Sequence, residues 1–357
     1  MPVIHVPSNI RDYDVIFEEK PDFIEDLVEQ KNRLFVVDEN VWNFYSNSFL
    51  KQLPPEDTII FPINEDRKNL ESVSNIYDYL INMSAKKNLT LITIGGGILQ
   101  DITGFVASTL YRGIKWIFIP TTLLAQADSC IGSKTSLNYK GFKNLIGTYY
   151  PPNSVHIFTT FLSTLQQLDF SSGLGEVVKL NIMGGNDRVR QIISQYSSIL
   201  SRDSSVLRDV VYQALLIKMD YINGDEFDQG RRNYLNFGHC FGHAIEAVSD
   251  FRIPHGQAVV LGMIMANKVA LNRGVLSKIN HDVFFTNLLI PALIAKPQKE
   301  DLNIEKIISA MKKDKKRTGE GLPLIMVQDN YVMNKVDDLS EAEVKYAVNS
   351  IGDTVKL

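Results

Sequence analysis

The chain has few cysteines and no excess of positive charge, and both shortages exclude classes of protein. Cys130 and Cys240 are its two cysteines in 357 residues. Two cysteines cannot form the disulfide framework of a small secreted domain, and a thiolate zinc site needs more of them. We therefore expect buried, reduced thiols and a cytoplasmic location. The net charge is −4, from 41 acidic and 37 basic residues, which disfavours a nucleic-acid or anionic-membrane partner.

Long apolar runs, repeats and low-complexity segments are also missing from the sequence. A membrane span needs about 18 or more apolar residues in succession, and the sequence has no such run. Residues 1–10 lack the charged stretch and apolar run of a signal peptide, so none is expected. Apolar residues make up 45% and charged residues 22%, as in ordinary soluble globular proteins. The length suits two domains.

The first part of the chain alternates short apolar runs with helical patterns. Strands are predicted at 33–38, 58–62, 89–94, 115–120 and 154–158. Helical patterns lie between them, for example at 21–30, 70–84 and 100–111. This alternation predicts a parallel sheet covered by helices on both faces.

Helical patterns dominate from about Thr164 onward. They occur at 176–182, 188–200, 205–222, 239–249, 256–273, 281–290 and 304–313, and a strand at 322–328 is the main exception. We therefore predict an α/β domain over residues 1–164 and a mostly α-helical domain over residues 165–357.

Three glycines, Gly95, Gly96 and Gly97, stand between a predicted strand and a predicted helix. They allow the backbone to approach a pyrophosphate, and the helix start supplies N–H donors. The pattern is not the Gly-x-Gly-x-x-Gly fingerprint, and a tight turn without a ligand explains the glycines alone equally well. The position at the carboxyl end of a strand favours a nucleotide site.

Further polar residues follow the next predicted strand. Thr121 and Thr122 can bond phosphate or ribose, although Thr122 is also a good helix cap, and Asp128 can accept from a hydroxyl. The segment 132–135, Gly-Ser-Lys-Thr, lacks the glycine spacing of a nucleotide-binding P-loop, which argues against a nucleoside triphosphatase. Its lysine, with Lys143 and Asn144, is expected in a loop between helices that either binds an oxyanion or is solvated.

Glu176 and Lys179 lie three residues apart in a predicted helix. A surface ion pair is the default interpretation of this spacing. Gly173 and Gly175 just before them indicate close packing, however, which favours a buried role.

Three of the six histidines fall between His239 and His255. His239 and His243 are four residues apart, and this spacing predicts a helical pair of metal ligands. A core role for His243 is the alternative. Arg231, Arg232 and Asn236 precede the histidines and can hold a phosphate or carboxylate. The basic run at 312–317 is interpreted as a charged helix end, from which one lysine can reach a site.

Taken together, these motifs resemble the 3-dehydroquinate synthase family of sugar phosphate cyclases. The resemblance extends from Thr90 to about Arg273, in the family's order and spacing. It is carried by the glycine turn and by segments 111–113, 120–128, 134–135, 143–144, 176–179 and 236–255. It implies a Rossmann-like NAD-binding domain, an α-helical metal-binding domain and a phosphate-releasing cyclisation in the shikimate pathway. Zinc is the expected metal, with cobalt or iron as alternatives.

The resemblance also implies the role of each residue. The implied metal ligands are Glu176, His239 and His255, which makes His243 a substrate-side residue, against the spacing prediction. The implied NAD-binding residues are Asp38, Asn40, Glu65, Lys68, Gly95, Gly96, Gly97, Asp101, Thr121, Thr122 and Thr164. The implied catalytic and substrate-binding residues are Asp128, Lys134, Lys143, Asn144, Lys179, Lys218, Arg232, Asn236, His243 and Lys315. Arg112 is expected to reach a neighbouring subunit's site, which implies a homodimer.

Several residues depart from the family pattern. Gln100 and Ser133 stand where glycine is usual, Gly175 replaces alanine, Asp228 replaces glutamate, and Gln257 replaces the glutamate after the last histidine. Gln257 removes a charge near a proposed ligand, where a carboxylate can tune a metal.

These departures keep other activities open. One is a sister cyclase for a neutral sugar phosphate, such as 2-deoxy-scyllo-inosose synthase or a sedoheptulose 7-phosphate cyclase. Another is a metal-dependent polyol dehydrogenase, which would release NADH. A dehydrogenase has no phosphate for the lysines at 134, 143, 179 and 218 to hold. A non-catalytic relative is expected to lack a metal ligand, and none is missing.

Overall fold

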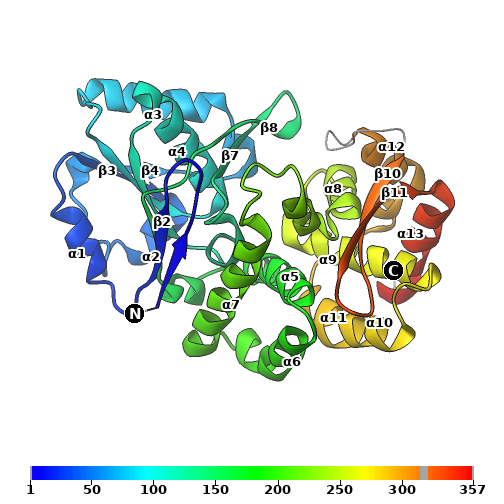
Figure 1. Ribbon diagram of the computed structural model, residues 1–357. Coiled ribbons are helices and arrows are strands. Elements are labelled where there is room, and N and C mark those ends of the chain that lie inside the picture. Colours follow the sequence, from blue (N-terminus) through cyan, green and yellow to red (C-terminus); the bar gives the residue numbers. More distant parts are fainter. Residues whose placement is uncertain (1, 314–320, 356–357) are drawn as a thin grey trace. The chain divides into compact units, whose positions relative to one another are not determined.

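The computed structural model describes residues 2–313 and 321–355, with side chains to residue 351. The chain forms two compact units (Figure 1). Unit 1 comprises Met1–Leu165 and Ile222–Phe227, and unit 2 comprises Gln166–Tyr221 and Asp228–Leu357. The sequence predicted a single boundary after Thr164. The structure adds the short segment Ile222–Phe227 to unit 1, so the chain crosses between the units three times.

The described part of unit 1 holds a seven-stranded sheet in the order β1-β2-β9-β6-β5-β3-β4. The six strands from β2 to β4 in this order all run parallel to one another. The first strand, β1, pairs antiparallel with β2. The strands are β1 (Val3–Val6), β2 (Tyr13–Phe17), β3 (Arg33–Asp38), β4 (Thr58–Phe61), β5 (Thr90–Gly95), β6 (Lys115–Pro120) and β9 (Ser154–Ile157). All five predicted strands are present, while β1 and β2 were not predicted.

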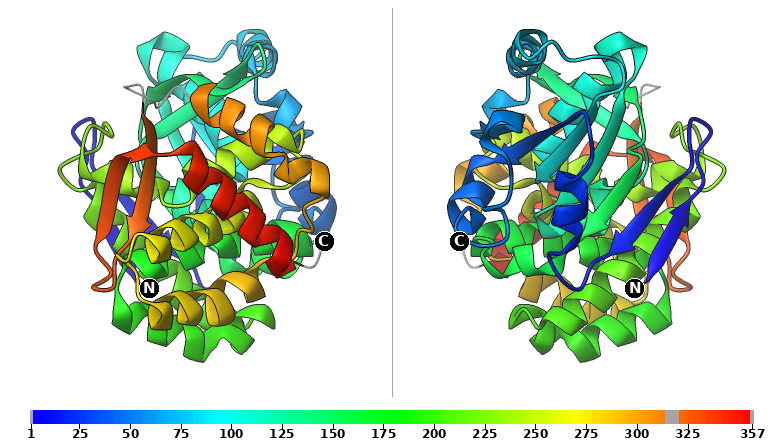
Figure 2. Two further views of the ribbon diagram at one scale, coloured as in Figure 1. Left: turned by 90° about the vertical axis from the view of Figure 1, so that its right-hand side faces the viewer. Right: turned by 90° about the vertical axis from the view of Figure 1, so that its left-hand side faces the viewer.

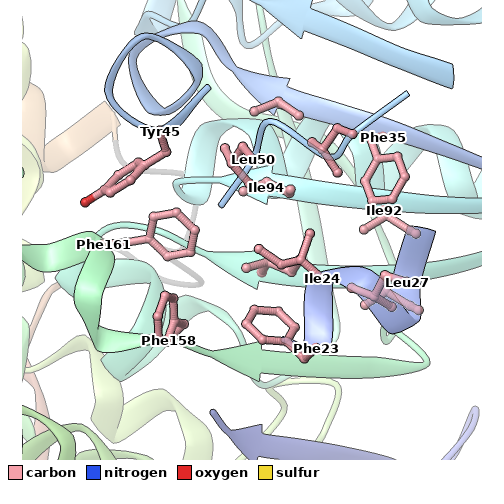
Figure 3. Close-up of a cluster of buried hydrophobic side chains, with 14 residues drawn as sticks. Phe23, Ile24, Leu27, Phe35, Tyr45, Leu50, Ile92, Ile94, Phe158 and Phe161 are labelled. Atoms are coloured by element: carbon pink, nitrogen blue, oxygen red, sulfur yellow. The ribbon is translucent and has the colours of Figure 1, made fainter. Parts of the chain in front are cut away.

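Four α-helices connect the strands of unit 1. They are α1 (Phe23–Val28), α2 (Glu39–Tyr45), α3 (Leu70–Asn82) and α4 (Gly97–Thr109). A buried cluster joins α1 and α2 to one face of the sheet (Figure 3). It includes Phe23 and Leu27 from α1, Phe35 from β3 and Ile92 from β5, each less than 8% exposed. Burial of the central strands on both faces explains their nearly continuous apolar sequences.

The segment that carries Lys134 and Lys143 is a β-hairpin, so the predicted loop between helices is wrong. Its strands β7 (Lys134–Tyr139) and β8 (Phe142–Tyr149) pair antiparallel. Lys140 and Gly141, with φ of 48° and 79°, make the turn. Positive φ at both central residues is the mark of a tight hairpin turn. The hairpin packs on α4.

Unit 2 is mostly helical. Its α-helices are α5 (Gln167–Met183), α6 (Asn186–Leu200), α7 (Ser204–Ile222), α8 (His239–Val248), α9 (His255–Asn272), α10 (Lys278–Phe284), α11 (Ile290–Ala292), α12 (Ile304–Lys313) and α13 (Glu341–Val355). A hairpin of β10 (Leu322–Val327) and β11 (Met333–Leu339) accompanies them. Within the described residues, no helix has the length and apolarity needed to cross a membrane.

Helix α13 was not predicted, and α5 begins nine residues before the predicted start at residue 176. Phe170 to Met183 are all buried, so this helix has no polar face. A helix that is buried all round lacks the amphipathic period by which sequence patterns are detected.

The C-terminal helix α13 and strand β11 of unit 2 are bound to the end of α9. Helices α12 and α13 pack together, and α13 packs on α9 (Figure 2). Arg273, which follows α9, bonds both Glu343 carboxylate oxygens at 2.6 and 2.8 Å and Asp338 at 2.7 Å. The Arg273 guanidinium is the main cause that lowers the pKa of Glu343 to about 2.

We expect Glu343→Gln to lower the free energy of unfolding by about 2 kcal/mol at pH 7, because charge-assisted bonds to Arg273 are lost. A carboxylate whose pKa is lowered by folding stabilises the folded state at pH values above its ordinary pKa of 4.5. This stabilisation is lost as the pH falls through the folded-state pKa of about 2. The deficit should therefore shrink between pH 4.5 and 2 in urea unfolding followed by circular dichroism.

The matched control for this change is Glu341→Gln, which removes the half-exposed pair between Lys312 and Glu341. Such pairs contribute about 0.5 kcal/mol or less. A Glu343→Gln deficit of the same size at pH 7 and pH 2.5 would contradict the assigned ion pair.

Candidate active site

Helices α5, α8 and α9 approach each other so closely that only glycine fits at their crossings. A Cβ atom on Gly175 would lie 2.4 Å from the carbonyl oxygen of Gly256, and one on Gly256 would lie 1.8 Å from that of Ser172. A Cβ atom on Gly262 would lie 1.9 Å from the carbonyl oxygen of Gly238. These contacts fix the positions from which the acidic and imidazole groups of unit 2 project.

Glu176, His239 and His255 come together at these crossings. Their ligand atoms all lie within 4.8 Å of one another. Glu176 Oε1 is 3.8 Å from His239 Nε2 and 3.4 Å from His255 Nε2. The Glu176 side chain is 1% exposed. One carboxylate and two imidazoles are a donor set that suits zinc and related divalent ions.

The other nitrogen of each imidazole is held by an acceptor. His239 Nδ1 lies 3.1 Å from the carbonyl oxygen of Phe237, and His255 Nδ1 lies 3.0 Å from Glu246 Oε2. Because both partners are acceptors, each Nδ1 carries the proton and donates it. Each Nε2 is then left to face Glu176, as in histidines that bind metals.

Charge in this cluster favours a cation. Burial lowers the pKa of His255, but Glu246 and Glu176 outweigh burial and raise it to about 10. A divalent ion among these carboxylates would take the place of that proton.

His243 lies beside the same cluster. Its ring centroid is 5.2 Å from that of His239 and 5.9 Å from that of His255. His243, Glu246 and His255 form a second group with ligand atoms within 4.8 Å. The structure therefore places the rings of all three histidines together. Cys240, next to His239, is partly exposed, whereas Cys130 is buried as expected.

Among its described residues, unit 2 also buries three lysine and arginine side chains. Lys179 is 2%, Lys218 6% and Arg232 4% exposed. Lys179 pairs with Glu176 inside the unit, so the default of a surface ion pair is wrong, and the burial indicated by the neighbouring glycines is confirmed. Arg231, by contrast, forms a surface pair with Asp220 at 2.5 Å. Asn236 ends the 3-10 helix Arg231–Asn236 that precedes the histidines.

Unit 1 gathers a second set of predicted residues at the carboxyl ends of β3, β5 and β6. Asp38 ends β3, Gly95 ends β5, and Thr121 follows β6 and donates its N–H to the Gly95 carbonyl at 2.9 Å. A Cβ atom on Gly95 would lie 3.4 Å from Asp38 Cβ. Burial raises the pKa of Asp38, whose carboxylate caps α2 by accepting from the Asn40 N–H at 2.8 Å. Thr122 accepts from the Ala125 N–H at 3.2 Å, which is the capping role considered for it.

A third set lies where the β7–β8 hairpin meets α4. Lys68 Nζ is 2.5 Å from Asp101 Oδ2 and donates to Asn144 Oδ1 at 2.7 Å. Glu65 Oε1 lies 3.7 Å from Lys143 Nζ. The structure thus joins residues that the resemblance divided between cofactor and substrate. Burial raises the pKa of Asp101, while Lys68 opposes the shift.

The remaining predicted residues lie at defined places. Thr164 Oγ1 is 2.9 Å from the Tyr45 hydroxyl, Asp128 lies in the π-helix Ala125–Ser129, and Lys134 is exposed at the start of β7. Arg112 is exposed with φ of 60°. Lys315 lies outside the described residues.

Comparison with known proteins identifies the family. The model of the 3-dehydroquinate synthase N-terminal region matches residues 58–172, and that of the C-terminal region matches residues 173–317. The chain belongs to the 3-dehydroquinate synthase family. The family and the enzyme class predicted from the sequence are confirmed.

Relatives of this family cover nearly the whole chain. The 3-dehydroquinate synthase of Streptococcus pyogenes serotype M3 is 36% identical over 334 residues, which are 90% of this chain and 92% of the relative. The 2-epi-5-epi-valiolone synthase of Streptomyces hygroscopicus, solved with NAD⁺ and Zn²⁺, superposes with a TM-score of 0.86 at 21% identity, covering 98% and 99% of the two chains. A 2-deoxy-scyllo-inosose synthase, solved with carbaglucose-6-phosphate, NAD⁺ and Co²⁺, gives 0.85 at 23% identity, covering 98% and 100%. The predicted two-part α/β and helical fold is confirmed.

Two departures from the 3-dehydroquinate synthase family pattern have local causes. Gly175 leaves room for the Gly256 backbone, as described above. Gln257 is fully buried and uses its whole amide. It donates to the carbonyl oxygens of Ser171 and Ala292 at 2.8 and 2.9 Å and accepts from the N–H groups of Ile294 and Ala295 at 2.8 and 2.9 Å. An ionised carboxylate cannot donate, so this environment requires glutamine.

Ser133 is a third departure, and its hydroxyl bonds a residue that the sequence did not indicate. Ser133 has φ of 64° and donates to Glu226 Oε1 at 2.5 Å. Glu226 also accepts from Ser8 Oγ and from the Asn9 N–H, both at 2.7 Å. These bonds tie the returning segment Ile222–Phe227 to the turn before Lys134.

Sequence reasoning also missed Glu246, which supports His255. Its position three residues after His243 was a signal, since both residues share a helix face. The return of the chain after α8, which places Glu246 beside His255, was not visible in the local pattern.

Gly256→Ala should reduce metal affinity by about 10- to 100-fold, the usual cost of disturbing the support of a ligand. The added Cβ has to push the start of α9, and with it His255, away from α5. Gly274→Ala, at the other end of α9, is the control: its φ of 68° strains alanine, but nothing lies within 4 Å of the added atom. Metal content after dialysis, measured by mass spectrometry beside circular dichroism, separates the two. Unchanged metal affinity in folded Gly256→Ala would contradict the packing argument.

Proposed function

We propose that this protein is a 3-dehydroquinate synthase, which converts 3-deoxy-D-arabino-heptulosonate 7-phosphate to 3-dehydroquinate and phosphate. It uses NAD and one divalent metal ion, with zinc as the first candidate. NAD is regenerated, so the net reaction is a phosphate-releasing cyclisation. The family match and the 36% identity to the streptococcal enzyme support the choice of substrate.

The observation that carries the proposal is the burial of Lys179, Lys218 and Arg232 in the same unit as the carboxylate–imidazole group. Lys179 pairs with Glu176, and lysine or arginine side chains buried this deeply are rare outside sites that bind or react. A doubly charged phosphate and a carboxylate on one substrate match several cations at once. A polyol has neither group, so these cations favour a cyclase over a polyol dehydrogenase.

The residues present suit a metal ion. Glu176, His239 and His255 would hold it through one carboxylate oxygen and the two Nε2 atoms, with Phe237 and Glu246 fixing the rings. When bound, the ion would polarise a substrate hydroxyl, and NAD would supply the reversible uptake of a hydride from that carbon.

The N–H groups at the start of α4, beside Gly95 to Gly97, would hold the NAD pyrophosphate. Asp38 at the end of β3 can accept from ribose hydroxyl groups. The network of Lys68, Asp101 and Asn144 holds the hairpin on α4 and so orients Lys143.

The chain's own groups position the substrate and its charges. Arg232 and Lys218 bind and orient oxyanions, and their burial excludes water from those contacts. Lys179, paired with Glu176, sets the charge next to the reacting hydroxyl. His243 lies beside the ligand group and can hold a proton or a substrate oxygen. The leaving phosphate, once aligned, is itself a base for the neighbouring C–H.

A sister cyclase for a neutral sugar phosphate is the second candidate. The two superposed structures carry such activities in their names, although their identity of 21% and 23% supports the shared fold alone. The acid substrate is preferred because Arg232, with Lys218 or Lys315, supplies a cation for its carboxylate.

The proposal includes a homodimer in which Arg112 reaches the neighbouring subunit's site, and a cytoplasmic place in the shikimate pathway. Arg112 is exposed, and three successive residues, Tyr111, Arg112 and Gly113, have φ of 52°, 60° and 118°. Positive φ in non-glycine residues costs energy and tends to be retained at functional positions.

Metal-loaded protein with NAD should release phosphate from 3-deoxy-D-arabino-heptulosonate 7-phosphate without net NADH. The test measures phosphate and absorbance at the NADH band together, with glucose 6-phosphate and sedoheptulose 7-phosphate as parallel substrates. Preference for either neutral sugar phosphate would select the sister cyclase. Net NADH without phosphate would overturn the cyclase proposal.

His255→Ala should lose bound metal, because it removes one ligand, and His243→Ala should keep metal and lose at least about 100-fold in rate, as for an acid–base or orienting group. Metal content and phosphate release are measured on the same samples. His5→Ala, on β1, is the control, because the His5 side chain is 65% exposed, and both quantities are expected near wild type. Loss of metal in His243→Ala would favour the group of His243, Glu246 and His255 instead.

A further inference from the structure

Gln100 and Ser129 form a closed pair of hydrogen bonds in unit 1. Gln100 Nε2 donates to the Ser129 carbonyl oxygen at 2.7 Å, and Ser129 Oγ donates to Gln100 Oε1 at 2.6 Å. Gln100 lies in the first turn of α4 and is 5% exposed. Ser129 ends the π-helix that contains Asp128 and remains partly exposed. The pair therefore links the glycine turn to the segment of Asp128.

The pair also fixes which way the Ser129 hydroxyl points. A carbonyl oxygen only accepts, so the Gln100 group facing it must be the NH₂ end of the amide. The amide oxygen then faces Ser129 Oγ and requires its proton. With glycine at position 100, which is usual in the family, the hydroxyl would be able to rotate and donate elsewhere. In this chain its remaining capacity is that of an acceptor.

Ser129 Oγ lies next to the proposed nucleotide turn. A Cβ atom on Gly97 would lie 3.4 Å from it, so little more than one atom's thickness separates this oxygen from the start of α4. An acceptor at this place repels phosphate oxygens and attracts a hydroxyl donor. Ser129 adjoins Asp128, to which the family resemblance gives a catalytic or substrate-binding role, so the nicotinamide half of NAD should lie nearest.

We propose that Ser129 binds the nicotinamide-side ribose of NAD by accepting a hydrogen bond from a ribose hydroxyl. Gln100 is the positioning residue that holds Ser129 in this acceptor state. The inference rests on the proposed use of NAD. Gln100, which stands where the family usually has glycine, would thus contribute to NAD binding by orienting the Ser129 hydroxyl group.

Calorimetric titration of the metal-loaded protein, without sugar phosphate, tests this inference with NAD, ADP-ribose and AMP. Ser129→Ala should bind NAD and ADP-ribose about five- to tenfold more weakly, the size of one neutral hydrogen bond, and AMP as wild type does. Gln100→Ala should weaken the same two ligands by about threefold, because the hydroxyl becomes free to rotate. The double variant should equal Ser129→Ala, since Gln100 acts through Ser129. Ser74→Ala, on α3, is the matched control.

Equal weakening of all three ligands would mean a merely structural role and would overturn the inference, as would NAD affinities within twofold of wild type. Binding is measured without turnover, so the two proposals fail separately. If the variants show the expected pattern of NAD binding but the wild-type protein releases no phosphate, the inference is supported and the proposed function is contradicted. Wild-type protein that binds no NAD overturns both.

Discussion

The close crossing of α5, α8 and α9 is the constraint on which the candidate metal-binding group depends. Backbone atoms at Gly175, Gly256 and Gly262 approach so closely that a single added carbon would overlap a carbonyl oxygen. Dense packing of this kind gives side chains little freedom, so Glu176 and His255 project to one point. A metal site needs ligands held to within a fraction of an ångström, and this helix packing supplies that rigidity.

The same packing leaves unit 2 with buried charges that do not stabilise it by themselves. Glu176, Lys179 and Arg232 are each at most 4% exposed, and removing charges from water costs more than most ion pairs return. Such groups persist where they serve binding or catalysis, at some expense of stability. Unit 1 also contains a largely buried ion pair, between Lys68 and Asp101. Lys68 bonds Asn144 of the β7–β8 hairpin as well, and this bond holds Asn144 near Asp101.

Local sequence pattern predicted the parallel sheet because each central strand is buried on both faces and reads as a continuous apolar run. The same logic failed where burial removes the contrast between faces, as at the start of α5. It also failed at β7 and β8, where Gly141, Asn138 and Asn144 suggested a loop although they belong to a tight turn and its flanking strands. Pairing between strands is decided by partners that a local pattern does not contain.

The sequence by itself determined the family and the fold class and predicted most residues of the candidate site, because these depend on residue types in a fixed order. The tertiary structure decided how those residues are used. Spacing paired His239 with His243, whereas the turn after α8 brings His255 to Glu176 and Glu246 and fixes which ring nitrogen faces inward. Gln257 looked like a lost charge near a metal and is instead a fully bonded amide. Which groups meet depends on contacts between helices, and a linear pattern does not record them.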